Sequence, residues 1–415
     1  MRLNDLTADQ IMALKKEAKM EYIRVGCDYF KLIKKPDRFG VFRNQLKKWN
    51  KEEIKLDLGN RALYDIPKYN DFILDPDNTG NTKIKHGCYN MYATFEHKPR
   101  YGDFEWSLKI MEHIFGEQVE LGFRYMKVMY ENPRRMLPIL ALVSTERSTG
   151  KTTFLDWLNI IFGANMVMIE PDVIGSTFNA EYAAANIIGI DETVIDRQVA
   201  VEKIKSLATK KNISVNMKNV SQFTLPFFGK IVMASNNEEK FMKIESQEIR
   251  FWVRKIGFPK YENHNIIEDL QREIPAFLYH LAELPEVDFT KSRMVFTGEE
   301  LENETLLKVK KASKTWLYKE LGELMDDYFN NSTKPFVYMR PKDVKDRFFS
   351  HNNLVQISYI RSVLKNEYEI DPEKMGHYSL DETLNDSSFK GCPFKFTSEL
   401  IGIIQEVEQI EKMPF

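Results

Sequence analysis

The residues with the clearest chemical potential lie in the stretch LVSTERSTGKTTF, residues 142–154. A phosphate-binding loop usually reads Gly-x-x-x-x-Gly-Lys-Ser/Thr. Gly150, Lys151 and Thr152 match this pattern, and Thr145 stands at the position of the first glycine. In such a loop the backbone N–H groups surround the phosphates, the lysine contacts the β- and γ-phosphate oxygens, and the hydroxyl helps to hold Mg²⁺. The predicted nucleotide contacts are Thr149, Gly150, Lys151, Thr152 and Thr153.

The surroundings of this loop favour a phosphate site. It follows the apolar run LPILALVS and precedes FLDWLNIIF, which has the spacing of an amphipathic helix. Thr145 allows the loop to close if it keeps ordinary dihedrals and Gly150 takes the strained backbone position. A surface loop with a helix cap is the alternative interpretation.

Two acidic residues, Asp191 and Glu192, follow a second apolar run, NIIGI. An acid at the end of a neighbouring strand can bind Mg²⁺, and an adjacent glutamate can polarise the attacking water. We assign the first role to Asp191 and the second to Glu192. Acids after a strand are also common as a simple helix or turn start. Asp191 lies 40 residues after Lys151, an interval that suits one strand–helix–strand excursion and favours the catalytic interpretation.

Two further polar residues stand beside apolar runs. Asn236 follows GKIVMAS, where an amide can reach the γ-phosphate or the attacking water. Arg250 precedes FWVRKIGF and is a candidate arginine finger for a neighbouring subunit's γ-phosphate, with Arg254 next in line. The alternatives are that asparagine simply favours turns and that Arg250 is a solvated surface residue.

The elements that must position these residues are five short buried runs between about 137 and 258. Near-continuous apolar strands separated by helical or loop segments predict an α/β fold with a parallel, helix-covered sheet. Residues 104–130 carry apolar residues at helical spacing and predict one or two helices. The five runs are LPILALVS, MVMIE, NIIGIDE, GKIVMASN and FWVRKIGF.

Composition excludes several classes of protein. The formal net charge of the 415 residues is only -2, so nucleic-acid contacts must come from local basic patches. The three cysteines form no CxxC pair and the seven histidines no ligand-spaced cluster, which argues against structural zinc. The same cysteine pattern leads us to expect a reducing cytoplasm, and the first 25 residues read as an amphipathic helix without a signal peptide or membrane span.

The phosphate loop, the acid pair Asp191–Glu192, Asn236 and Arg250 follow one another along the chain. Together, in this order, they resemble the superfamily 3 helicases of the AAA+ class, in particular the helicase part of phage and plasmid primase-helicases. The resemblance covers about residues 86–260 and includes YNMYATFEHKP upstream of the loop. It implies an AAA+ P-loop NTPase core with a five-stranded parallel-type sheet, ATP and Mg²⁺ as cofactors, and a homo-oligomeric, hexameric ring on single-stranded DNA in a bacterial host's cytoplasm.

The resemblance also gives a role to NISVNMKNVSQFTLPF, which on pattern alone is a hairpin turning at Lys218 and Asn219. In such helicases the hairpin projects into the ring and grips the single strand. Lys218 would then contact phosphate, with Lys210 and Lys211 near the hairpin base. Many relatives have a glycine pair where these two lysines stand. A solvated hairpin with surface lysines is the alternative.

The predicted organisation has four parts. The last hundred residues suggest three short helices followed by a strand pair, which would suit a winged-helix-like domain, with a plain helical packing domain as the alternative. The parts are an N-terminal accessory domain (1–85), a helical lead-in (86–130), the ATPase domain (131–285) and the C-terminal domain (300–415).

The sequence therefore predicts an ATP-dependent replicative DNA helicase of a phage or other mobile element. Any coupled primer synthesis is expected on a separate primase or polymerase chain, because residues 1–85 show no paired-acid polymerase motif. One rival is a DNA-binding loader or switch ATPase without unwinding activity. A second is a non-hydrolysing structural subunit, which the intact Lys151, Asp191 and Glu192 disfavour.

Overall fold

The computed structural model describes residues 21–36, 42–80, 83–191, 195, 198–217, 220, 222–380 and 389–401. The chain divides into two compact units. The first comprises Met1–Met242 with Ile249–Leu306, and the second comprises Lys243–Glu248 with Leu307–Phe415. Within the described residues, no helix combines the length and the apolar character needed to cross a bilayer.

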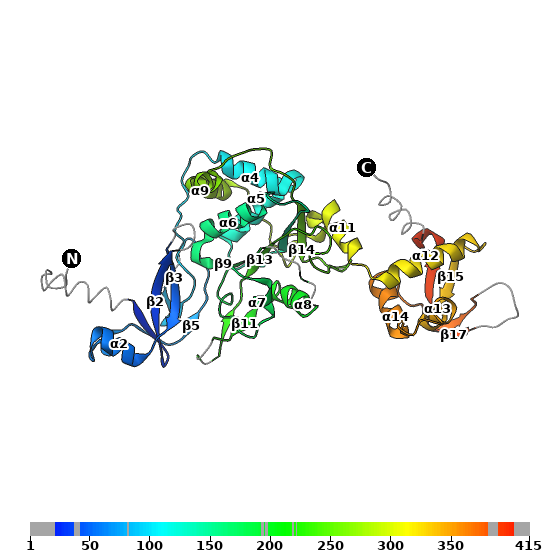
Figure 1. Ribbon diagram of the computed structural model, residues 1–415, viewed down its shortest axis with the longest axis horizontal. Coiled ribbons are helices and arrows are strands. Elements are labelled where there is room, and N and C mark those ends of the chain that lie inside the picture. Colours follow the sequence, from blue (N-terminus) through cyan, green and yellow to red (C-terminus); the bar gives the residue numbers. More distant parts are fainter. Residues whose placement is uncertain are drawn as a thin grey trace. The chain divides into compact units, whose positions relative to one another are not determined.

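A five-stranded parallel sheet forms the centre of the first unit (Figure 1). Its strand order is β14-β8-β13-β10-β9, so β13 lies between β8 and β10 although it follows both in sequence. The five strands predicted from apolar runs are confirmed, because burial on both faces selects such near-continuous apolar strands. Their bounds are β8 Ile139–Val143, β9 Met166–Met168, β10 Ile187–Ile190, β13 Lys230–Ser235 and β14 Phe251–Lys255.

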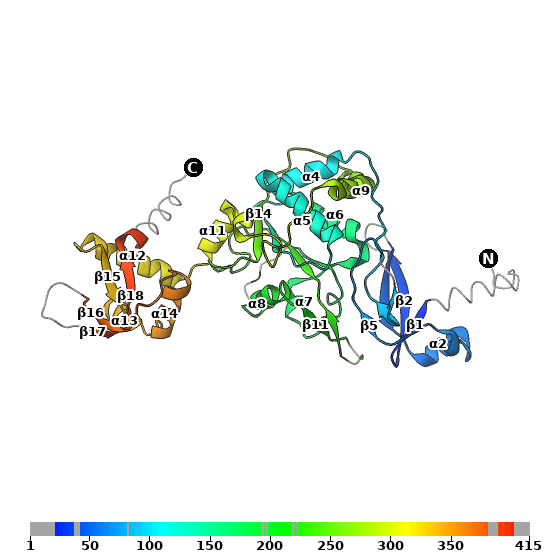
Figure 2. The same cartoon turned by 180° about the vertical axis from the view of Figure 1, so that it is seen from behind.

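Helices cover both faces of this sheet (Figures 1 and 2). On one face Leu140, Leu142 and Trp252 pack into one apolar cluster with four helices, two of which fulfil the prediction for residues 104–130. Those four are α4 Glu105–Phe115, α5 Val119–Glu131, α6 Lys151–Phe162 and α9 Ile266–Glu283. The opposite face carries α7 Pro171–Gly175 and α8 Gln198–Leu207, and the short α10 Gly298–Leu301 lies near the end of the unit.

The N-terminal part of the first unit contains a second sheet. Its strands are ordered β3-β2-β1-β4, with antiparallel pairing of β1 to β2 and of β2 to β3. β1 occupies residues that the sequence pattern assigned to a helix over 1–25; residues 1–20 lie outside the described part. The strands are β1 Tyr22–Val25, β2 Asp28–Pro36, β3 Phe42–Lys48 and β4 Lys68–Tyr69.

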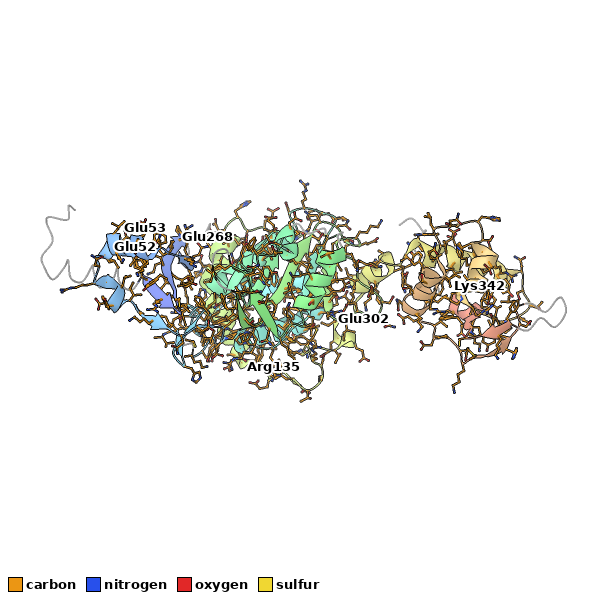
Figure 3. All side chains as sticks on the ribbon, turned by 90° about the horizontal axis from the view of Figure 1, so that it is seen from below. Glu52, Glu53, Arg135, Glu268, Glu302 and Lys342 are labelled. Carbon is orange, nitrogen blue, oxygen red and sulfur yellow. The ribbon has the colours of Figure 1, made fainter. Side chains whose placement is uncertain are left out.

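Short elements complete this region. Asn50 caps α2 by accepting a hydrogen bond from the Glu52 backbone N–H, and Glu52 and Glu53 lie at the helix's positive end (Figure 3). A small sheet of β5, β7 and β6 follows. The elements are α2 Lys51–Leu58, α3 Ala62–Asp65, β5 Phe72–Ile73, β6 Ile84–Lys85 and β7 Cys88–Asn90.

The second unit is a small α/β domain with its own apolar core, which includes Leu317, Leu321, Ile360 and Phe396. Its three main helices agree with the sequence prediction, but a strand, β15, follows the first of them and pairs antiparallel with β18. A two-stranded β16–β17 pair is also present. The elements are α11 Glu304–Ala312, α12 Trp316–Asn330, β15 Phe336–Met339, α13 Pro341–Phe348, α14 Ile357–Asn366, β16 Gly376–Tyr378, β17 Phe389–Gly391 and β18 Phe394–Thr397.

Candidate nucleotide site and nucleic-acid hairpin

The loop between β8 and α6 has the backbone that a phosphate cradle needs. Gly150 is the N-cap residue of α6 and has φ +88° in the left-handed region, which favours glycine. Ser148 also has a positive φ, +56°, whereas Thr145 does not. The loop thus closes with Thr145 in an ordinary conformation, which answers how it dispenses with the first glycine. The N-terminus of a twelve-residue helix, with its positive dipole end, faces this loop.

The Lys151 side chain lies inside the loop and is only 6% exposed. Its ammonium donates hydrogen bonds to the Ser144 hydroxyl, to the Thr149 hydroxyl at 3.0 Å and to the Glu146 carbonyl at 3.4 Å. Within the described residues it forms no ion pair with a carboxylate. A buried ammonium held only by neutral oxygens is well placed to gain from an anionic ligand.

Burial lowers the pKa of Lys151, since desolvation disfavours the charged amine. Three carboxylates oppose this shift, those of Asp191, Glu146 and Glu238. The Lys151 amine therefore lies near three negatively charged carboxylates. A cation bound beside them would offset their negative charge.

The Thr152 hydroxyl donates a hydrogen bond of 2.9 Å to the Asp191 carboxylate, which joins the first turn of α6 to the end of β10. This hydroxyl–carboxylate pair offers the oxygen ligands that Mg²⁺ prefers. The described residues contain no group of three or more His, Cys, Asp or Glu placed to hold a metal. A cation at Thr152 and Asp191 would need phosphate and water oxygens to complete its shell. Glu192 lies outside the described residues.

β13 brings Asn236 to the same edge of the sheet. In a parallel sheet all carboxyl ends meet at one edge, and β13 lies between the strand before the loop and the strand before Asp191. The Ser144 N–H donates to the Ser235 carbonyl at 3.1 Å, so the residue before Asn236 is bound to the start of the loop. Asn236 itself is exposed. Thr153, in the first turn of α6, is half-buried.

Two residues that sequence reasoning missed contact the loop directly. The Glu238 carboxylate accepts a hydrogen bond of 3.2 Å from the Thr145 N–H and pairs with Lys255 at 3.0 Å. The His113 ring nitrogen Nε2 lies 2.8 Å from the Thr149 carbonyl oxygen. The pattern NNEE after β13 was a signal for Glu238, but no local pattern marks His113, which comes from α4.

The two candidate arginines have different surroundings. Arg250 is half-buried before β14, at the edge opposite the phosphate loop, and donates a 3.0 Å hydrogen bond to the Lys205 carbonyl of α8. Arg254 is 5% exposed and donates to the Glu117 carboxylate at 2.7 Å and the Phe115 carbonyl at 2.7 Å. Arg254 is therefore committed to its own chain, and the position of Arg250 keeps it from its own phosphate loop.

The predicted hairpin is present as β11 Asn212–Val215 and β12 Phe223–Pro226, paired antiparallel. Lys210 and Lys211 lie at its base, where the Phe227 N–H donates to the Lys211 carbonyl. Lys211 is exposed and Lys210 half-buried. Lys218 and Asn219, the predicted turn, lie outside the described residues.

Comparisons with known proteins give a family match and several similar structures. A family described as a family of unknown function, DUF5906, matches residues 142–250, which span the loop, Asp191, the hairpin and Arg250. An apo structure of the NrS-1 C-terminal region (305–718) is 14% identical, covers 93% of this chain and 97% of that one, and has a TM-score of 0.64.

The chain shares the fold of that region. Two A-form apo structures of the same region give TM-scores of 0.63 and 0.56, at 14% and 16% identity. They cover 92% and 88% of this chain, and 97% and 87% of theirs. No curated protein matches the sequence.

The site thus combines a helix N-terminus, a buried lysine, a hydroxyl–carboxylate pair and an exposed amide at one sheet edge. Such a set can bind a polyphosphate with its cation, and it can stabilise charge that develops on a transferring phosphoryl group.

Proposed function

We propose that this chain is an ATP-hydrolysing motor that acts on single-stranded DNA, a replicative helicase of a phage or other mobile element. The observation that carries the proposal is the meeting of Lys151, the Thr152–Asp191 pair and Asn236 at the carboxyl edge of one parallel sheet. These residues follow three strands that are separate in sequence, β8, β10 and β13, so a chance resemblance in a single surface turn does not account for them.

Each residue has a physical role in this proposal. The loop N–H groups and Lys151 bind the ATP phosphates, and Thr152 and Asp191 hold Mg²⁺, which when bound neutralises phosphate charge. Glu192 orients the attacking water, and Asn236 contacts the γ-phosphate or that water. Arg250, remote from its own loop, serves the nucleotide of a neighbouring subunit in a ring.

The chain order supports coupling between ATP and DNA. α8 and the β11–β12 hairpin are inserted between β10, which ends before Asp191, and β13, which ends before Asn236. Both strands that flank the insertion therefore deliver a candidate catalytic residue. A shift of these strands as the γ-phosphate is lost would be transmitted to the hairpin.

The fold shared with the NrS-1 C-terminal region over 93% of this chain supports the arrangement of helices and strands, and the activity is proposed from the residues of the site. The winged-helix-like interpretation of the second unit remains a prediction. A primase or polymerase partner on another chain is likewise a proposal.

The test measures ATP hydrolysis with and without oligo(dT), together with displacement of one strand from a forked duplex. We expect DNA-stimulated hydrolysis with displacement, and Lys151→Ala should reduce hydrolysis at least about a hundredfold, since a positioned phosphate contact contributes several kcal/mol. Lys291→Ala, an exposed lysine remote in sequence from the loop, is the control. Stimulated hydrolysis without displacement would favour the loader or switch. Unchanged turnover in Lys151→Ala would refute the site.

A further inference from the structure

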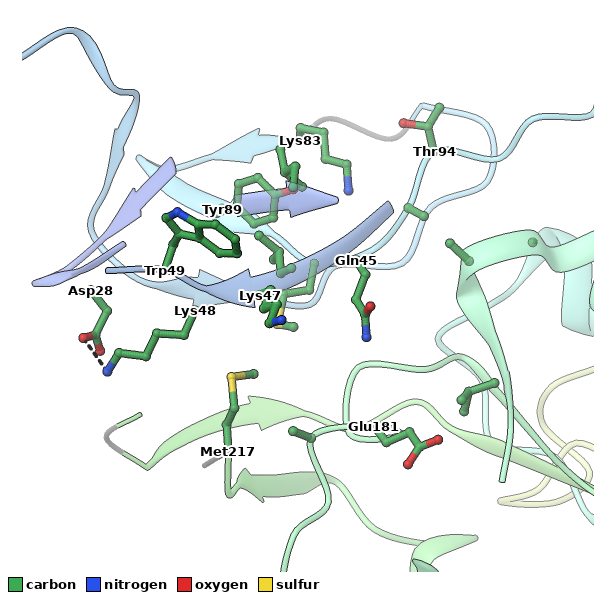
Figure 4. Close-up of a pocket in the computed structure, with 18 of the residues that line it drawn as sticks. Asp28, Gln45, Lys47, Lys48, Trp49, Lys83, Tyr89, Thr94, Glu181 and Met217 are labelled. Atoms are coloured by element: carbon green, nitrogen blue, oxygen red, sulfur yellow. Dashed lines mark ion pairs between the residues drawn. The ribbon is translucent and has the colours of Figure 1, made fainter. Parts of the chain in front are cut away.

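A cavity of about 1430 Å³ lies inside the first unit, between the N-terminal sheet and the core that carries the phosphate loop (Figure 4). Leu46 and Lys47 of β3 line one side, and Ile161 and Val167 line the other. Small-molecule pockets usually measure about 300–1,000 Å³. This larger space suits an extended ligand better than a compact one.

The side of the cavity formed by β2 and β3 is positively charged. Among the cavity-lining residues of the stretch 28–51, three are lysines (Lys47, Lys48 and Lys51) and one is an aspartate, Asp28. Lys47 and Lys51 line the cavity, are exposed and form no ion pair within the described part of the chain, whereas Lys48 is paired with Asp28 at 2.9 Å. The acidic lining residues Glu96 and Glu181 belong to other segments. The free positive charge is therefore concentrated on one wall.

One of the lining lysines, Lys47, faces a further cation within the sheet. Lys31 and Lys47 are direct cross-strand partners, and their ammonium groups lie 5.0 Å and 5.9 Å from the Trp49 ring centroid. Like charges at such positions are destabilising; Glu21, 4.0 Å from the Lys31 ammonium, and the aromatic ring offset part of that repulsion, whereas Lys47 forms no ion pair within the described residues. An anionic ligand would relieve the remainder.

Another lysine lies on the wall of the same cavity. Lys83 donates hydrogen bonds to the Tyr92 carbonyl at 2.8 Å and the Asn90 carbonyl at 3.3 Å, and its ammonium lies 5.4 Å from the Tyr89 ring centroid. Burial lowers the pKa of Lys83 to about 8. A phosphate nearby would stabilise its charged form.

Aromatic side chains stand among these lysines. Tyr29, Trp49 and Tyr89 line the cavity, and the first two are half-buried. Proteins grip single-stranded nucleic acid without sequence preference by combining lysines that follow the phosphates with aromatic rings that stack on bases. The cavity has both groups along one wall.

The hairpin reaches this same cavity. Met217, just before the predicted turn, lines it and points from the hairpin toward Lys47 (Figure 4). Phe72 of β5 stacks on Phe223 of β12, with ring centroids 5.2 Å apart, and so fixes the hairpin to the N-terminal region. We propose that single-stranded nucleic acid runs from the β11–β12 hairpin through this cavity along β2 and β3, a path that rests on the proposed function.

The test compares oligo(dT) binding by the full chain and by the double variant Lys47→Ala/Lys51→Ala, using fluorescence anisotropy at several salt concentrations. Each lost phosphate contact should reduce the log–log salt slope by about 0.7, so two should reduce it by about 1.4 and weaken binding roughly 25-fold at 0.1 M salt. The control, Lys55→Ala/Lys291→Ala, removes the same charge outside the cavity lining and should bind nearly as the wild type does.

A second measurement does not depend on variants. Cys27 lines the cavity and is exposed, so oligo(dT) should slow its alkylation, as read by mass spectrometry, while inorganic phosphate should not. Unchanged affinity and slope in Lys47→Ala/Lys51→Ala, with Cys27 unprotected, would overturn the path. If the wild type still hydrolyses ATP and displaces a strand, the proposed function survives that result.

Discussion

Replacing Arg250 and Arg254 separately should give opposite patterns of damage, although the two residues are only four positions apart. Arg250→Ala removes a half-buried hydrogen bond to the Lys205 carbonyl, so we expect a loss of about 1–2 kcal/mol in the free energy of unfolding. If Arg250 acts on a neighbour's nucleotide, ATP hydrolysis should fall about a thousandfold or more, equivalent to roughly 4 kcal/mol of transition-state stabilisation.

Arg254→Ala should instead damage the fold. It removes a 5% exposed guanidinium and leaves the Phe115 carbonyl without its charged donor at 2.7 Å. Its partner Glu117 is 73% exposed and can be solvated, so the expected loss is about 3 kcal/mol rather than the larger cost of an isolated buried charge. Below its melting temperature, the variant should keep most of its hydrolysis.

The assay pairs urea unfolding, followed by circular dichroism, with phosphate release. It then mixes Arg250→Ala subunits with Lys151→Ala subunits, because some interfaces of a mixed ring would have both an intact loop and an intact arginine. Partial recovery of hydrolysis is expected, and native mass measurement checks that mixed rings form. Full activity of Arg250→Ala, or a dead mixture in which mixed rings are demonstrated, would refute the role in trans.

Three further changes test other parts of the reasoning. Glu192→Gln should bind ATP normally yet leave it unhydrolysed, as a filter-binding assay can show; lost binding would make Glu192 structural. Lys218→Ala should reduce the salt slope of single-strand binding by about 0.7 and uncouple hydrolysis from unwinding, unless Lys218 is only a solvated lysine. Burial lowers the pKa of Lys230 to about 7. In the unfolded chain the pKa of this lysine is about 10.4, so between pH 7 and about 10.4 the unfolded chain holds a proton that the folded chain has lost. The free energy of unfolding should therefore rise with pH across this range, by up to about 1.4 kcal/mol per pH unit. Lys230→Met should flatten that rise in urea titrations at pH 7.5 and 9.5, and an unchanged slope would contradict the buried amine.

Local patterns were sufficient to predict the core of the site. Runs of apolar residues ending at Asp191 and Asn236 identify buried parallel strands, and parallel strands necessarily bring their carboxyl ends to one edge. The strand order is not encoded locally, so the position of β13 between β8 and β10 required the structure. His113 illustrates the same limit, because its contact with the Thr149 carbonyl joins residues 36 positions apart.

The strands of the N-terminal sheet were not predicted from the sequence, for a different reason. β2 and β3 are rich in lysine, and a charged segment with turn residues favours loop on composition alone. Phe30 and Leu32 nevertheless lie on either side of Lys31 at the two-residue period of a strand, and the pairing of Phe30 with Lys48 sets the register. The pairing of β2 with β3 therefore holds these lysines in fixed positions on a sheet. A binding surface requires such fixed positions.

The surroundings of Arg250 also bear on how a ring could link ATP to DNA. Its guanidinium holds the Lys205 carbonyl in the last turn of α8, and α8 ends three residues before Lys210 at the hairpin base. A guanidinium has five N–H donors, so Arg250 can contact a neighbour's phosphate and retain this carbonyl. Movement of Arg250 toward that phosphate would then pull on α8 and on the hairpin that follows it. The neighbour's nucleotide would therefore act on this subunit's hairpin through Arg250, while its own nucleotide acts through β10 and β13.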